Sequence, residues 1–185
     1  MTTAPLLVGL TGRAGAGKST VAAYLEREFA FVEIAMADPI VNMIGALFAD
    51  ADIDGAWMVE RALKEQPTAL GFSYRQLAQT LGTEWGRSLA PDFWLRVASL
   101  RLAAPHLQTE NIVVSDVRFP NEAEWLQARG GVLVRVVRDI TPQARPHVSE
   151  SHSDHLTVTT ELLNFGSQAT LFDQVDRLVD SLRRA

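Results

Sequence analysis

Apolar residues occur along the chain in two patterns, short continuous runs and longer stripes with helical spacing. Runs at 6–10, 31–35, 111–116 and 132–137 are short and rich in Val, Ile and Leu, which is typical of strands buried on both faces of a parallel sheet. A shorter run at 162–165 indicates a last strand. Helical stripes stand between several of these runs, so the pattern predicts an α/β fold with a parallel sheet.

The middle of the chain interrupts this alternation, because its apolar stripes predict helices only. Two of them cover 40–48 and 57–65, and two more follow Ser73 and Asp92. We expect a helical substrate-binding region over about 40–108, inserted into a single domain that covers 1–185.

One of these helices opens with a recognisable cap. Ser73 and Gln76 have the spacing of a capping box, and the stripe that follows passes through Leu77, Leu81 and Trp85. The indole of Trp85 either fills the core or stacks on the ring of a ligand, and the core is the commoner fate.

The turn after the first strand run has the composition of a phosphate-binding loop. Residues 12–19 read GRAGAGKS, which fits the pattern G-x-x-x-x-G-K-[ST], with a strand before it and a helix after it. Glycines let successive backbone N–H groups approach an anion, and the helix adds its positive end. Lys18 would reach the terminal phosphates of a nucleoside triphosphate, and the Ser19 hydroxyl would ligate the accompanying Mg²⁺. The candidate nucleotide-binding residues are Gly12, Arg13, Ala14, Gly15, Ala16, Gly17, Lys18, Ser19 and, as a neighbour, Thr20.

Two aspartates follow predicted strands. Asp38 lies before Pro39 at the start of a helical stripe, where it fits either an N-cap or a ligand contact at the carboxyl edge of the sheet. Asp116 ends the run at 111–116 and is our candidate for an acid near the magnesium ion or the reacting phosphate. A structural Asp at a strand end is the alternative for Asp116.

Residues 138–155 lack any periodic pattern, as is common in lids and binding loops. We expect Arg138 and Arg145 to close over the transferring phosphate. We expect His147, Ser149 and Glu150 to face the second substrate. The histidines of this segment also suggest a metal site, although the phosphate loop requires an oxygen-loving ion such as Mg²⁺.

Composition narrows the class of partner. The net charge is −5 and basic residues do not cluster, so we expect no binding to polymeric nucleic acid. The chain has no cysteine, no membrane-length apolar run and no signal-like N-terminus, from which we expect a cytoplasmic protein with no membrane partner.

Several further stretches occur in the order seen in one known family. They are YRQL at 74–77, LGTEWGR at 81–87, SDVRFPNEA at 115–123, GG at 130–131, HVSE at 147–150 and NFGS at 164–167. In these the chain resembles the deoxynucleoside monophosphate kinases of tailed bacteriophages. The resemblance covers nearly the whole chain, and 82–87 and 116–122 are its most specific parts.

The resemblance implies a P-loop NTPase three-layer fold with a parallel sheet, a helical substrate-binding insertion and a lid segment. It implies transfer of the γ-phosphate of ATP, with Mg²⁺, to a deoxynucleoside 5′-monophosphate, by a phage-encoded enzyme in the host cytoplasm that is often a homodimer. Lys18, Asp38 and Asp116 would then serve the reaction. Acceptor contacts would come from Asp38, Arg75, Glu84, Trp85, Arg87, Arg118, His147 and Glu150, and metal contacts from Ser19 and Asp116.

Two alternatives stay open at this stage. A kinase like dephospho-coenzyme A kinase also combines a phosphate loop with an Asp after its second strand, but its acceptor is a sugar hydroxyl. A non-catalytic, nucleotide-dependent switch would bind ATP without transferring phosphate to a monophosphate.

Overall fold

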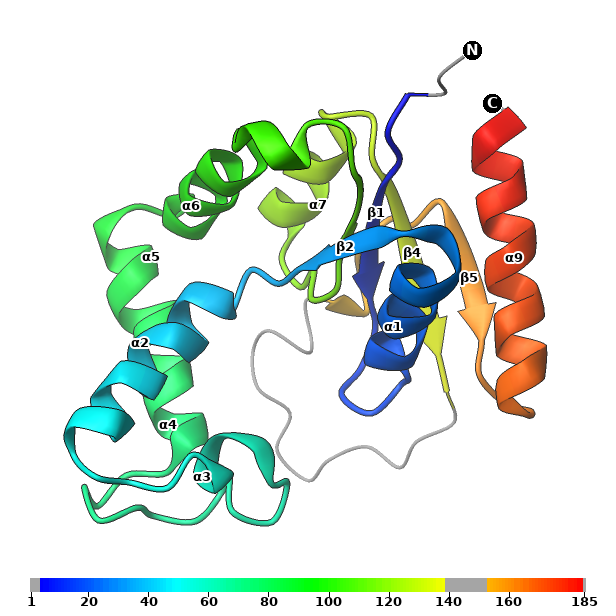
Figure 1. Ribbon diagram of the computed structural model, residues 1–185. Coiled ribbons are helices and arrows are strands. Elements are labelled where there is room, and N and C mark those ends of the chain that lie inside the picture. Colours follow the sequence, from blue (N-terminus) through cyan, green and yellow to red (C-terminus); the bar gives the residue numbers. More distant parts are fainter. Residues whose placement is uncertain (1–3, 139–152, 185) are drawn as a thin grey trace. The chain divides into compact units, whose positions relative to one another are not determined.

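The computed structural model describes residues 4–138 and 153–184 (Figure 1). Its contacts divide the chain into two compact units, a helical unit formed by Met36–Ala98 and a sheet unit formed by the chain on both sides of it. The expected helical region of 40–108 thus begins later and ends later than the helical unit.

The sheet unit holds a five-stranded sheet in which every strand pair is parallel. The strand order is β2-β3-β1-β4-β5, so β1 lies at the centre. The strands are β1 (Leu7–Thr11), β2 (Phe31–Ile34), β3 (Asn111–Val114), β4 (Val132–Val137) and β5 (Thr160–Leu163). This confirms the α/β fold with a parallel sheet; the predicted strand at 162–165 is displaced by two residues.

Helices cover both faces of this sheet, which gives three layers (Figure 1). The helices of the sheet unit are α1 (Lys18–Phe29), α7 (Pro120–Gln127), α9 (Gln168–Arg184) and the short η2 (Pro105–Leu107). Val8 and Leu10 of β1 share one core with the buried faces of α1 and α9. Gly9 faces the other way, toward Leu126 of α7, and a Cβ at Gly9 would lie 2.6 Å from a methyl group of Leu126. Successive residues of β1 therefore face opposite helical layers, α1 and α9 on one face of the sheet and α7 on the other.

The helical unit has a core of its own. Its helices are α2 (Asp38–Asp50), α3 (Ala56–Val59), α4 (Tyr74–Gln79), the π-helix η1 (Thr80–Trp85), α5 (Gly86–Leu89) and the start of α6 (Phe93–Leu102). Ile40, Ile44 and Phe48 of α2 pack with Trp94 of α6 at its centre. The predicted helix at 57–65 is wrong in length, because only Ala56–Val59 is helical and turns follow it.

The predicted capping box at the start of α4 is confirmed by two hydrogen bonds. The Ser73 hydroxyl accepts from the backbone N–H of Gln76 at 3.2 Å, and the Gln76 side chain accepts from the N–H of Ser73 at 2.9 Å. Both donors would otherwise lack a partner at the start of a helix.

Within the described residues, no helix is long and apolar enough to span a bilayer.

The turn after β3 is organised by one buried carboxylate. Glu122 is 4% exposed, and its Oε2 accepts from the backbone N–H groups of Arg118 at 2.8 Å and Phe119 at 3.1 Å. These N–H groups lie at the start of α7, where an acceptor and a negative charge are both favourable. Glu122 thereby fixes the backbone that carries Asp116 and Arg118 away from the sheet.

Glu122→Ala should lower the free energy of unfolding by about 2 kcal/mol, because two N–H groups lose a charged acceptor in a buried place. Glu124→Ala is the matched control, since Glu124 is an exposed carboxylate on the same helix and should change stability by less than about 0.5 kcal/mol. Urea denaturation of the two variants measures the difference. Equal losses would show that the buried acceptor is not the organising contact.

Candidate active site

The phosphate loop joins β1 to α1, as the sequence predicts. Gly12 and Gly17 have φ angles of 129° and 110°, a region that residues with a Cβ rarely occupy. A side chain at Gly12 would also clash with the backbone carbonyl oxygen of Val136 on β4. The loop therefore runs against the neighbouring strand, and glycine is required on two independent grounds.

The lysine of the loop lies over the loop backbone. Lys18 is the first residue of α1, and its Nζ donates to the carbonyl oxygens of Gly12 at 2.7 Å and Arg13 at 2.9 Å. Ser19 and Thr20 occupy the first turn of the same helix. The positive end of the helix and the ammonium group both adjoin the loop, which suits an anion.

Asn164, just after β5, supports the loop and was missed as a site residue by sequence reasoning. Its Nδ2 donates to the carbonyl oxygen of Ala16 at 2.8 Å, and its own N–H donates to Val137 at 2.7 Å. A Cβ at Gly17 would lie 2.5 Å from this amide nitrogen. Its place beside a strand end and in the NFGS motif at 164–167 are the signals that point to it, but neither indicates the contact, which joins far-separated parts of the chain.

An open pocket of about 350 Å³ lies beside the loop in the sheet unit, lined by Gly12, Arg13, Ala16, Arg135, Val136, Val137, Arg138, Asp154 and Glu161. Arg13 spans part of it with a two-pronged ion pair, in which its Nη2 lies 2.8 Å from Asp154 and its Nε donates to the same carboxylate. Both side chains are partly exposed, so this pair adds little to stability. Its position matters more, because it places a carboxylate next to the phosphate loop.

Arg135 holds the floor of the pocket. It is 19% exposed, and its guanidinium donates to Glu161 at 3.1 Å and to the carbonyl oxygen of Leu156 at 2.6 Å. The side chain therefore ties β4 to β5 and to the segment that carries Asp154. Arg138, one residue beyond β4, is exposed and lines the same pocket.

Asp116 follows β3 by two residues and is half-buried. The backbone next to it is fixed by the N–H of Val117, which donates to Leu10 of β1 at 3.0 Å. Because β1 and β3 are parallel neighbours, Asp116 and the phosphate loop leave the same edge of the sheet. Arg118 is exposed just beyond it.

Asp38 belongs to the helical unit, and of its two predicted roles the N-cap is wrong. Ala37 is the N-cap of α2, Asp38 is the first helical residue, and Pro39 follows inside the first turn. No side-chain bond caps this helix end. An acid in the first turn still interacts favourably with the helix dipole.

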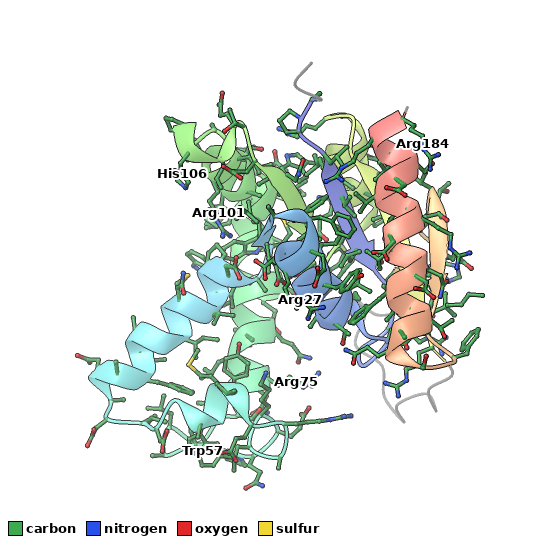
Figure 2. The ribbon with its side chains drawn as sticks, turned by 45° about the vertical axis from the view of Figure 1, so that its right-hand side comes forward. Arg27, Trp57, Arg75, Arg101, His106 and Arg184 are labelled. Carbon is green, nitrogen blue, oxygen red and sulfur yellow. The ribbon has the colours of Figure 1, made fainter. Side chains whose placement is uncertain are left out.

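The other candidate acceptor residues of the helical unit lie on α4, η1 and α5. Arg75, labelled in Figure 2, forms an ion pair with Glu65. Glu84 and Trp85 are exposed, and 42% of Trp85 is accessible to solvent. The prediction that Trp85 fills the core is therefore wrong. Arg87 donates to the carbonyl oxygen of Pro91 at 3.3 Å.

Two pKa shifts belong to this unit. Burial raises the pKa of the Tyr74 hydroxyl. The hydrogen bond from Arg96 of α6 lowers the pKa of the carboxyl of Asp92, the residue just before that helix.

The predicted lid falls largely outside the described residues, and so do Arg145, His147 and Glu150. Among residues 4–138 and 153–184, no group of three or more His, Asp or Glu side chains is arranged to hold a metal ion. The sheet unit thus gathers the phosphate loop, Asp116 and Arg138, whereas Asp38, Arg75, Glu84, Trp85 and Arg87 belong to the helical unit.

Comparison with known proteins decides the family. Residues 58–167 match the model of the deoxynucleotide monophosphate kinase domain. A protein of Acanthamoeba polyphaga mimivirus, provisionally assigned as a deoxynucleotide monophosphate kinase, is 32% identical over 78% of this chain and 80% of its own. The chain belongs to the deoxynucleotide monophosphate kinase family. This kinase is therefore a phosphotransferase, as the resemblance in its motifs implied.

Solved structures agree with the fold of this kinase. The crystal structure of TT1252 from Thermus thermophilus covers 97% of this chain and 98% of its own, with 20% identity and a TM-score of 0.52. At that identity the likeness concerns the fold alone.

In this kinase, Asn164→Ala should weaken ATP binding about fivefold to tenfold, because the Ala16 carbonyl loses its donor and the loop loses a support. Asn164→Asp should weaken it further, since a carboxylate would face a carbonyl oxygen and the nucleotide phosphates. Isothermal titration calorimetry with ATP measures both.

Gln174→Ala is the matched control for Asn164. The Gln174 amide also bonds the backbone of Leu163 at the end of β5, and it donates to the carbonyl oxygen of Thr170 one turn earlier on α9. Its loss should lower stability and leave the ATP dissociation constant within twofold. Equal weakening in both variants would mean that Asn164 acts through β5 and not through the loop.

Proposed function

We propose that this kinase transfers the γ-phosphate of ATP to the phosphate of a deoxynucleoside 5′-monophosphate. The bond between the γ-phosphorus and the oxygen of ADP breaks, and a bond from that phosphorus to an acceptor phosphate oxygen forms. The products are ADP and the deoxynucleoside diphosphate. The observation that carries the proposal is the phosphate loop of β1 and α1, built into a chain of this family.

Phosphoryl transfer needs positioned positive charge more than covalent help. The Lys18 ammonium group donates to two carbonyl oxygens of the loop. When a nucleotide occupies the loop, its phosphate oxygens would replace these carbonyls as acceptors. The exposed Arg138 lines the pocket beside the loop and supports a second contact to the transferring phosphate. Arg13, bound to Asp154, would reach the nucleotide only after releasing that carboxylate.

Magnesium fits the oxygen donors at this edge of the sheet. Ser19, on the first turn of α1, and Asp116, after β3, offer a hydroxyl and a carboxylate, the ligands that this hard ion prefers. When bound, Mg²⁺ would neutralise charge on the phosphates of ATP. The protein residues hold and orient the two substrates around it.

For the acceptor we propose the residues that the sequence predicts, which belong to the helical unit apart from Arg118. Arg75, Arg87 and Arg118 supply guanidinium groups suited to a monophosphate. Glu84 and Trp85, both exposed, suit the base or the sugar, by hydrogen bonding and stacking. Asp38 completes the set, and Arg145, His147 and Glu150 remain predictions for the segment between the described parts of the chain.

Three broader expectations belong to the same proposal. They are a homodimer, a cytoplasmic location and a bacteriophage origin. The first and the last rest on the resemblance of the motifs, and the cytoplasmic location rests also on the composition of the chain. The negative charge of the chain favours a small nucleotide over polymeric nucleic acid.

A coupled ADP-release assay tests the reaction. The purified protein is given ATP, magnesium and, one at a time, the four deoxynucleoside monophosphates, their ribonucleotide counterparts and dephospho-coenzyme A. Stimulation by a deoxynucleotide, with the diphosphate identified by chromatography, supports the proposal. Stimulation by dephospho-coenzyme A alone, or ATP hydrolysis that no acceptor changes, would overturn it.

Lys18→Ala should lower kcat at least about 100-fold, because a charged donor to the transferring phosphate is lost. Lys64→Ala is the control, since Lys64 is the other lysine of the chain and lies over the Tyr74 ring in the helical unit. That variant should keep its kcat. Both should melt within a few degrees of the parent in a thermal-shift measurement, and a fully active Lys18→Ala enzyme would remove the centre of the proposal.

A further inference from the structure

A π-helix interrupts the helix that carries the candidate acceptor residues. Residues 74–89 run through α4, η1 and α5, and η1 covers Thr80–Trp85 (Figure 1). At its end the N–H of Gly86 donates to the carbonyl oxygen of Leu81, five residues earlier. Single π turns inside α-helices are rare and are frequent at functional sites. This one lies within residues 58–167, which match the family model.

The π turn moves the buried position from Trp85 to Gly86. In an α-helix Leu77, Leu81 and Trp85 would share one face, because residues four apart are neighbours. Leu77 and Leu81 do pack on the core of the helical unit, but the next buried residue is Gly86, and Trp85 is 42% exposed. One extra residue in the turn thus rotates Glu84 and Trp85 outward.

Trp94 of α6 accounts for this geometry. Its indole N–H donates to the carbonyl oxygen of Gly82 at 2.7 Å. In an α-helix that carbonyl would bond the N–H of Gly86, which here donates to Leu81. The indole therefore supplies a partner for a carbonyl that the π turn displaces.

The Trp94 ring also explains why residue 86 is glycine. A Cβ at Gly86 would lie 2.5 Å from Cε2 and Nε1 of the indole. Trp94 is 6% exposed and sits in the core with Ile40, Ile44 and Phe48. On its outer side the indole meets Trp85, with ring centroids 6.2 Å apart, and Phe93, at 4.9 Å. A fixed core ring thus holds the turn on one side and the exposed Trp85 on the other.

We infer that Trp94 is a positioning residue for the acceptor nucleotide. It maintains the π turn through Gly82 and Gly86, and the turn presents Glu84 and Trp85 to the base or sugar of the monophosphate. This inference rests on the proposed function of Glu84 and Trp85. Trp94 itself acts through the turn and does not touch the substrate.

Trp94→Phe removes the indole N–H and part of the ring. It should raise the KM for the deoxynucleoside monophosphate about fivefold to tenfold, as expected for one lost hydrogen bond that orients the site, and leave the KM for ATP within twofold. Trp125→Phe is the matched control, because the Trp125 indole also donates one hydrogen bond, to the Ser99 hydroxyl at 2.9 Å, but in the sheet unit. It should leave both KM values within twofold.

Gly86→Ala tests the same contact from the other side. The new methyl group should displace the indole and raise the acceptor KM as Trp94→Phe does. Gly45→Ala is its control, since Gly45 is a helical glycine of the same unit whose Cβ would meet Met58 at an ordinary 3.6 Å. If Trp94→Phe and Gly86→Ala both keep the parental acceptor KM, or raise both KM values together, the inference is wrong.

Hydrogen exchange of the unmodified enzyme gives a result even where a variant fails to fold. A saturating monophosphate, without ATP, should slow amide exchange in the peptide that contains 80–87. Unchanged exchange there, in an enzyme that the ADP-release assay shows to be active, would overturn the inference and leave the proposed function intact. Absence of acceptor-stimulated activity would instead overturn the proposed function.

Discussion

The close approach of the phosphate loop to β4 and to Asn164 is the constraint on which the sheet unit depends. No side chain fits at Gly12 against the Val136 carbonyl, and none fits at Gly17 against the Asn164 amide. The loop can occupy this place only if β4 lies beside β1 in register and the chain leaves β5 at the right point. The shape of the anion site is therefore a product of the strand order and not of the loop alone.

Acids near the loop set how much of its positive charge is available to a nucleotide. Asp154 takes the guanidinium of Arg13, and Glu161 takes that of Arg135, so two arginines of the pocket wall are paired with carboxylates. Arg135 is mostly buried and serves the strands, whereas Arg13 is half-exposed and can exchange partners at low cost. The pocket thus combines one structural arginine with one that a phosphate can recruit.

The sequence predicts those features that depend on residues close to one another along the chain. The glycine spacing, the strand before it and the helix after it define the loop at 12–19, and the Ser73 capping box follows from a spacing of three residues. It does not predict Asn164 or Asp154 as partners of the loop, because those contacts join residues 148 and 141 positions apart. The cap of α2 also differs by one residue, since Asp38 satisfies the composition of a cap and of a first turn equally well.

The sequence pattern favours the core for Trp85, and this prediction is wrong because it assumes a constant helical period. A stripe through Leu77, Leu81 and Trp85 assumes that core-facing positions follow one another at an offset of four, whereas the offset from Leu81 to Gly86 across η1 is five. The extra residue leaves the Gly82 carbonyl to an outside donor, which the fold supplies from Trp94, twelve residues later. A π turn therefore cannot be predicted from the local sequence unless the donor to its displaced carbonyl is known. Trp85 lies at the surface because Trp94 already fills the core.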